Sequence, residues 1–365
     1  MFAAIIAALG MTADGLAEGL YAVRHRFSAR AASIGYAIGA GVGWFYNVVT
    51  PITFTVESIA VATRAVKKPP QILYVVALSA VPSIVLGLFG LYSTFVNWLD
   101  PAVVAGVIAG VGVILAGVGV GYVRERPYIA VPAVAAGVVG YVLTDNLVVV
   151  ILASMAVGTA ARYLVPERLQ DKAKSDGESG DDGDTDGEDA EEPGVGLIPF
   201  QWRDMIAPAV LIGAFSVFAL RTGAVVSYSR VNGELAGQEA NLDGVTVMAG
   251  LASLGSGLLG GPPLETTPAP MAATPQPVFS TVLFMALMAV LLFFGAVGRL
   301  GRYVPLQGIA GFLIVTGIPV IMPENLPAVA EAPLVGGTAL AITALSNPFY
   351  GLLAGQAVAL LGIGG

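Results

Sequence analysis

The sequence contains no cysteine and only one histidine, His25. Disulfides, thiolate chemistry and cysteine-ligated metal sites are therefore excluded. A single histidine is too few for an ordinary histidine-based metal site, and it leaves a Ser-His-Asp triad little to work with. We therefore expect no catalytic residues, no bound metal and no cofactor, and we expect that the protein is not an enzyme.

Charged residues are scarce too: they make up 12% of the 365 residues, whereas 56% are hydrophobic. A soluble domain has about 25% charged residues. Apolar stretches of the roughly 20 residues that a bilayer-spanning helix needs recur along the whole chain. The 47 Gly and 23 Pro fit this environment, because neighbouring membrane helices satisfy the backbone groups that such residues free. The composition predicts an all-α, multi-pass protein of the cell membrane, with lipid as a partner and no nucleic acid.

One acidic stretch divides the chain. Residues 171–192 hold 11 of the 25 Asp and Glu but only two of the 17 Lys and Arg, so the formal net charge of -8 comes mainly from them. Because this stretch has no apolar face to bury, we expect a solvated, disordered linker over residues 167–198. The flanking parts, residues 1–166 and 199–365, are nearly equal in length, as two copies of a duplicated unit would be.

Each half contains seven apolar segments. Those of the first half lie near residues 2–23, 30–47, 52–66, 71–92, 101–123, 127–143 and 146–165. Those of the second half lie near residues 204–220, 243–260, 264–274, 277–297, 304–321, 329–345 and 348–363. Because seven is odd, the second half enters the membrane in the opposite orientation. We therefore predict about 14 transmembrane segments arranged as two inverted repeats.

The third segment of each half, segments 3 and 10 of the chain, is interrupted by proline. Residues 50–53 (TPIT) and 262–268 (PPLETTP) cannot continue as regular helix, since proline lacks an N–H donor and restricts the residue before it. We predict a short extended piece followed by a half-helix in each. Non-helical backbone at membrane depth survives only where protein or a water-filled cavity surrounds it. Paired interruptions at matching positions indicate the binding site of a transporter.

Ionisable side chains inside a span cost roughly 2.5 to 3.5 kcal/mol, so the few present here are candidates for function. Glu265 and Glu57, at the two interruptions, can take up a coupling proton, contact the solute or cap a half-helix. Asp14 and Glu18 share a helix face and can hold a cation or a proton, although Glu18 can instead pair with an interfacial arginine. Arg221 either points into a cavity, where it favours an anionic solute, or snorkels to the interface.

The N-termini of both half-helices are expected to face the solute, because they offer free N–H groups and a partial positive charge. The residues that we predict to bind the solute are Thr53, Phe54, Thr55, Glu265, Thr266, Thr267 and Arg221. Those predicted to bind the coupling ion, a proton or Na⁺, are Glu57, Glu265, Asp14 and Glu18.

Four stretches occur in order and at compatible spacing: TPITF, DPAVVAGVIAGVGVILAG, GLASLGSGLLGGPPLETT and VPLQGIAGFLIVTGIPVI. Together they resemble the xanthine/uracil permease family of nucleobase and ascorbate transporters. The resemblance implies a core domain (1–92 and 199–297) and a gate domain (101–165 and 303–365), with the solute between segments 3 and 10. Sulfate permeases and anion exchangers share this architecture, so it does not separate the substrate classes.

Two family positions differ in this chain. The acidic residue that the family carries in segment 8 falls at Leu220 or Arg221, and the one after the segment 10 turn falls at Ala269. Three hypotheses follow. The first is a secondary active proton or cation symporter of a small polar solute, a nucleobase of the xanthine or uracil type. The second is an anion transporter or exchanger, of the sulfate or carboxylate type, on the same fold. The third is a membrane scaffold or sensor without transport. A homodimer is a further expectation.

Overall fold

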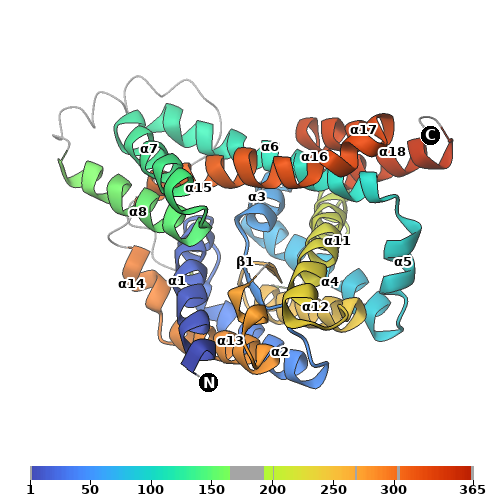
Figure 1. The fold of residues 1–365 in the computed structure, drawn as a ribbon, viewed down its shortest axis with the longest axis horizontal. Helices are drawn as coiled ribbons and strands as arrows, with labels where there is room; N and C mark the ends of the chain where they lie inside the picture. The colour runs from blue at the N-terminus through green and yellow to red at the C-terminus, as the bar shows by residue number, and fades with distance from the viewer. Residues whose placement is uncertain (1, 165–192, 200, 268, 302–304, 363–365) are drawn as a thin grey trace.

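The computed structural model describes residues 2–164, 193–199, 201–267, 269–301 and 305–362, which are mostly helical (Figure 1). The elements of the first half are α1 (Phe2–Arg24), α2 (Ala29–Phe45), β1 (Ile52–Phe54), α3 (Val56–Ala65), α4 (Pro69–Leu88), α5 (Tyr92–Trp98), α6 (Pro101–Glu125), α7 (Pro127–Thr144) and α8 (Leu147–Leu164). Those of the second half begin with α10 (Trp202–Met205), α11 (Pro208–Ala236), α12 (Leu242–Leu258), β2 (Leu264–Thr266), η1 (Pro270–Ala273), α13 (Pro277–Phe293) and α14 (Ala296–Gly301). The chain ends with η2 (Leu306–Ile309), α15 (Ala310–Val315), η3 (Thr316–Ile321), α16 (Met322–Glu331), α17 (Pro333–Leu345) and α18 (Pro348–Leu360).

Each of the expected segments has a counterpart among these elements. Among the described residues, five helices are long and apolar enough to cross a membrane: Pro69–Leu88, Pro101–Glu125, Pro127–Thr144, Pro208–Ala236 and Gln307–Glu331. Five further apolar helices of 10 to 17 residues accompany them. Large apolar side chains such as Leu345 and Leu143 stand exposed on their outer faces, as contact with lipid requires. The predicted acidic linker lies largely outside the described residues.

Two helices continue beyond the predicted limits. Helix α11 has 29 residues and runs to Ala236, whereas the sequence pattern predicted an end at residue 220. The pattern failed because several polar residues from Arg221 onward are buried inside the protein, namely Arg221, Thr222, Ser229 and Asn232. The span expected at 304–321 continues to Glu331 through the π-helical turn η3, which contains Pro319. Such a turn accommodates proline within a helix.

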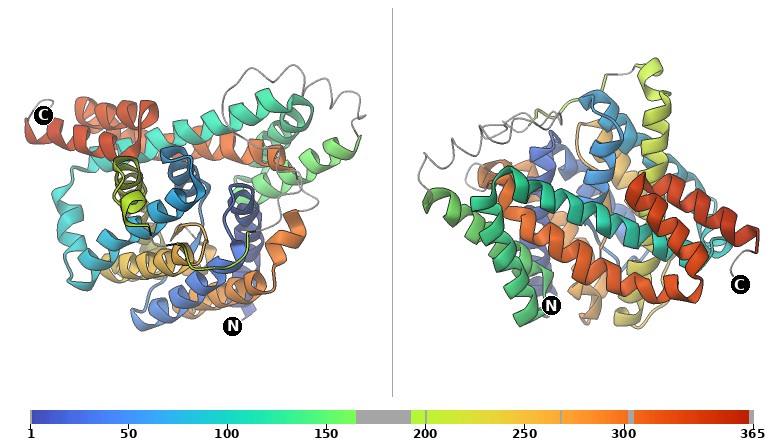
Figure 2. Two further views of the ribbon diagram at one scale, coloured as in Figure 1. Left: turned by 180° about the vertical axis from the view of Figure 1, so that it is seen from behind. Right: turned by 90° about the horizontal axis from the view of Figure 1, so that it is seen from above.

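The helices pack as two sets. In one set, α12 contacts both α4 and α2, and α13 contacts α2 and α1. In the other, α6 contacts α15, η3, α16 and α17, and α7 contacts α8. Figures 1 and 2 show α6, α16, α17 and α18 as one layer beside the first set. The two sets have the composition of the expected core and gate, although the domain boundaries stay a prediction.

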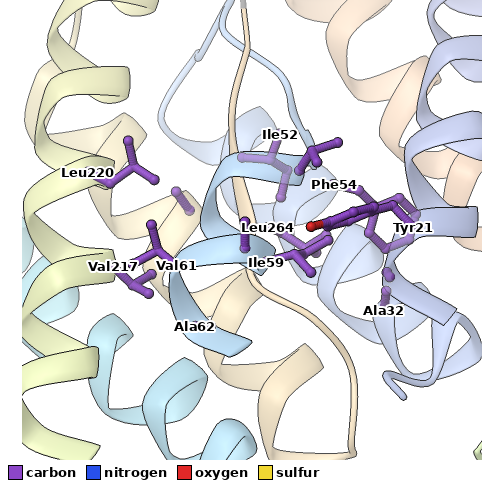
Figure 3. Close-up of a cluster of buried hydrophobic side chains, with 14 of the residues drawn as sticks. Tyr21, Ala32, Ile52, Phe54, Ile59, Val61, Ala62, Val217, Leu220 and Leu264 are labelled. Atoms are coloured by element: carbon purple, nitrogen blue, oxygen red, sulfur yellow. The ribbon is translucent and has the colours of Figure 1, made fainter. Parts of the chain in front are cut away.

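The two short strands lie within the core set (Figure 1). Strands β1 and β2 pair antiparallel, with Thr53 opposite Glu265. An antiparallel pair has local two-fold symmetry, which is the relation expected between elements of two inverted repeats. Figure 3 shows α3, which follows β1, with Val61 facing Val217 and Leu220 of α11. This apolar contact fixes the first half-helix against α11.

Candidate functional site

The strand pair is anchored by hydroxyl groups of the neighbouring helices. The Phe54 N–H donates to the Tyr36 hydroxyl oxygen at 3.1 Å, and that hydroxyl donates to Thr53 Oγ1 at 3.1 Å. On the other strand, Ser253 Oγ accepts from the Leu264 N–H at 3.0 Å and donates to the Leu264 carbonyl at 2.7 Å. Buried backbone groups must form hydrogen bonds, and the prolines just before β1 and β2 prevent helical hydrogen bonding there. The predicted extended pieces are therefore present.

The two half-helices differ from each other. Helix α3 has 10 residues, and its first turn carries Glu57. In the second half, the piece after β2 is a single 3₁₀ turn, η1. Asn232 of α11 forms two hydrogen bonds with the backbone just before this turn. Its Nδ2 donates to the Thr267 carbonyl at 2.9 Å, and its Oδ1 accepts from the Ala269 N–H at 2.9 Å. The expectation of two equivalent free amide ends is thus wrong for the second, where a side chain of α11 already satisfies one N–H.

Arg221 and Glu265 form a buried ion pair. Arg221 is 0% exposed, and its Nε and Nη2 donate to the two Glu265 carboxylate oxygens, both at 2.7 Å. The remaining guanidinium hydrogens bind the Ser79 carbonyl at 3.0 Å, Ser83 Oγ at 3.2 Å and Ser253 Oγ at 3.1 Å. Arg221 therefore does not snorkel to the interface, because it lies at the middle of a long helix and finds its acceptors inside the protein.

A cavity of about 570 Å³ opens beside this ion pair, at the boundary between the two helix sets. Ligand pockets commonly measure about 300–1,000 Å³. The core side supplies Glu18 from α1, Thr55 and Glu57 from the start of α3, and Glu265 and Thr266 from β2. The gate side supplies Ile108 and Val111 of α6, Phe312, Thr316, Val320, Ile321, Glu324 and Asn325. None of the described residues that line the cavity is Lys, Arg or His.

Three threonines of the cavity wall have buried hydroxyl groups. The Oγ1 atoms of Thr55, Thr266 and Thr316 are buried and have no hydrogen-bond partner in the described part of the chain. All three residues line the cavity. A buried polar group without a partner is costly, so each of these hydroxyl groups is available to a new hydrogen-bond partner.

The predicted site residues separate into two groups. Six of them line the cavity: Glu18, Thr55, Glu57, Glu265, Thr266 and Thr267. Thr53 and Phe54 do not, since their side chains face the core, where Phe54 packs edge-on against Tyr36. Arg221 lies behind Glu265 rather than on the cavity wall. Asp14 belongs to α1, but its side chain lies outside the described part of the structure.

Sequence reasoning missed several cavity residues. Ser227 and Tyr228 lie on the part of α11 beyond its predicted end, and Glu324 and Asn325 lie beyond the predicted end of the gate helix. The available signal was helical spacing: Tyr228 follows Arg221 by seven residues, or about two turns, and so shares its face. Ser58 follows directly after Glu57 in α3.

Comparison with known proteins rests on structure. No family model and no curated protein sequence matches the chain. A solved structure, the transmembrane domain of a cyanobacterium bicarbonate transporter, BicA, is similar with a TM-score of 0.61. The match covers 95% of this chain and 97% of that chain, at 19% sequence identity. The chain has the fold of that transmembrane domain.

The likeness confirms the predicted fold class, an all-α membrane transporter fold with core and gate. With the apolar helices it also confirms a multi-pass membrane protein. It supports the wider architecture that sulfate permeases share, whereas membership of the xanthine/uracil permease family is not confirmed.

Proposed function

We propose that this protein is a secondary active transporter of a small anion, and that it moves the anion through the cavity between core and gate. The observation that carries this proposal is the position of the cavity. It is bounded by both helix sets, beside a buried arginine held in the core. A neighbour of the same fold is, by its title, a bicarbonate transporter. Rocking of the core against the gate would expose such a cavity to each side of the membrane in turn.

A nucleobase symporter is the weaker candidate. Recognition of a base through its ring nitrogens needs carboxylates at the two positions that Leu220 or Arg221 and Ala269 occupy here. Glu265, four residues before Ala269, has both carboxylate oxygens engaged by Arg221. A scaffold without transport would have a packed centre, and the 570 Å³ cavity argues against it.

Coupling to a proton or Na⁺ belongs to the same proposal. The described lining residues include four carboxylates: Glu18, Glu57, Glu265 and Glu324. An anion that enters a cavity with this charge needs a compensating positive charge, since like charges repel strongly at low dielectric. We assign that role to the carboxylates, with Asp14 of α1 as a further member. A homodimer stays a prediction.

Uptake into liposomes tests the proposal. Purified protein is reconstituted, and uptake of radiolabelled bicarbonate, sulfate, succinate, xanthine and uracil is measured under an imposed proton or Na⁺ gradient, with protein-free liposomes as the control. We expect one class of anion to accumulate and unlabelled anions of that class to compete, while xanthine and uracil have no effect. Accumulation of a nucleobase, or of no compound at all, would contradict the proposal.

A further inference from the structure

The negative member of the ion pair, not the positive one, is next to the cavity. Glu265 lines the cavity, and Arg221 lies behind it with all five N–H donors engaged. An anion in the cavity therefore meets a carboxylate first, and it finds the positive charge already neutralised at 2.7 Å. In this arrangement Arg221 cannot bind an anion until Glu265 leaves it.

Glu265 itself has the shape of an anionic ligand. Its two oxygens accept two parallel hydrogen bonds from Nε and Nη2, the bidentate geometry that a planar carboxylate forms with a guanidinium. A solute anion of similar shape can form the same two bonds. If it did so while Glu265 stayed ionised, two negative charges would share one buried arginine, which is electrostatically unfavourable.

We propose that Glu265 and the transported anion exchange places on Arg221, and that Glu265 takes up one proton from the cavity when they do. The proton bonds to a Glu265 carboxylate oxygen, which becomes neutral, and Arg221 keeps its charge throughout. With a monovalent anion, one negative charge enters with one positive charge, so the net charge of the site does not change. This inference rests on the proposed anion transport and specifies its coupling ion as a proton and its acceptor as Glu265.

After the exchange, the anion and the displaced Glu265 carboxyl group both need hydrogen-bond partners. Thr266, the residue next to Glu265, lines the cavity, and its Oγ1 is buried without a partner in the described structure. A hydroxyl can donate to an anion or accept from a protonated carboxyl group. The anion is paired with Arg221 after the exchange, and the Thr266 hydroxyl can pair with the displaced carboxyl group.

Among the described residues, the other titratable groups beside the pair or on the cavity wall are acids. The Tyr92 side chain interacts electrostatically with Arg221 and Glu265. Glu57 of α3, Glu18 of α1 and Glu324 of α16 line the cavity and act electrostatically on Tyr228 of α11. None of them supplies a second positive charge for an anion. Each of the three glutamates is, however, a rival site for the proton, so the experiment must separate Glu265 from them.

Proton counting on the full-length wild-type protein tests the inference directly. Binding of sodium formate, bicarbonate and sulfate is measured by calorimetry in buffers of different ionisation enthalpy between pH 6 and pH 8, which counts the protons taken up. We expect about one proton per bound anion, and a Kd that rises about tenfold per pH unit where the free protein has Glu265 ionised. Anion binding without proton uptake would overturn the inference and leave anion transport standing.

Two variants assign the proton. Glu265→Gln should bind the same anion without proton uptake and with a pH-independent Kd, whereas a variant outside the cavity should keep the proton uptake of wild type. Glu331→Gln, an exposed position on α16, is the matched control. If Glu265→Gln fails to fold, the double variant Arg221→Gln/Glu265→Gln removes both charges and should bind no anion at any pH. Proton-linked binding that persists in either Glu265 variant would contradict the assignment.

Discussion

At the scale of single residues, the guanidinium of Arg221 shows how a charge persists at membrane depth. It has five N–H donors, and each finds an oxygen on Glu265, Ser79, Ser83 or Ser253. The attraction between two buried charges offsets the cost of removing them from water only when all their hydrogen bonds are made. The surrounding serines of α4 and α12 are thus part of the same unit as the ion pair.

We expect Arg221→Met to lower the free energy of unfolding by about 3–5 kcal/mol, because Glu265 is then left buried without a counter-charge. The double variant Arg221→Met/Glu265→Met should recover most of this loss. Thermal unfolding in detergent measures both, with Arg64→Met at an exposed position of α3 as the control, which should remain within about 0.5 kcal/mol of wild type. If the double variant is no more stable than the single one, the two residues do not act as a pair.

At the scale of elements, the gate is built on very close contact between backbones. A Cβ added at Gly112 of α6 would lie 2.6 Å from the Gly317 carbonyl oxygen of η3. Such contact between membrane helices requires small residues. It joins the π-helical turn, which places Thr316 in the cavity, to the long helix α6.

Two alanine substitutions in α6 test this contact. Gly112→Ala should destabilise the protein by about 1–3 kcal/mol, since neither backbone can yield easily. Gly117→Ala, where an added Cβ has no heavy atom within 4 Å, should be neutral or slightly stabilising. Thermal unfolding of both variants is the measurement. Equal melting temperatures for the two variants would mean that α6 and η3 are further apart.

At the scale of the whole molecule, transport requires core and gate to move against each other. Gly223 of the core helix α11 faces Ile108 of the gate helix α6: a Cβ added at Gly223 would lie 2.6 Å from Ile108 Cγ1. The Ile108 Cβ is one bond further, so two cysteines can reach the Cβ separation of roughly 3.5–4.5 Å that a disulfide needs.

We expect Ile108→Cys/Gly223→Cys to lose at least about tenfold of its uptake rate after oxidation, and to regain it with reductant, because the disulfide holds core and gate together. The chain has no other cysteine, so a thiol effect can arise only from this pair. Each single cysteine variant is a control that oxidation should not affect. Unchanged uptake in the cross-linked protein would exclude relative motion at this contact.

The sequence by itself determined the fold class and the positions of the two helix breaks. Membrane helices must satisfy their own backbone, so long apolar segments and prolines at positions 51 and 262–263 were sufficient to predict spans and two breaks. Helix ends were less accurate where polar residues face inward, because hydropathy does not distinguish a buried Arg221 from one at the interface. The extra length of α11, and with it Tyr228 as a cavity residue, was missed for that reason.

Only the tertiary structure decided which side chains meet. The pairing of Arg221 with Glu265, 44 residues apart, depends on how α11 packs on β2, and the binding of η1 by Asn232 depends on the same contact. Glu324 joins the cavity because the gate packs across the core. Local patterns cannot encode these contacts, since burial and partner choice arise when separate helices come together.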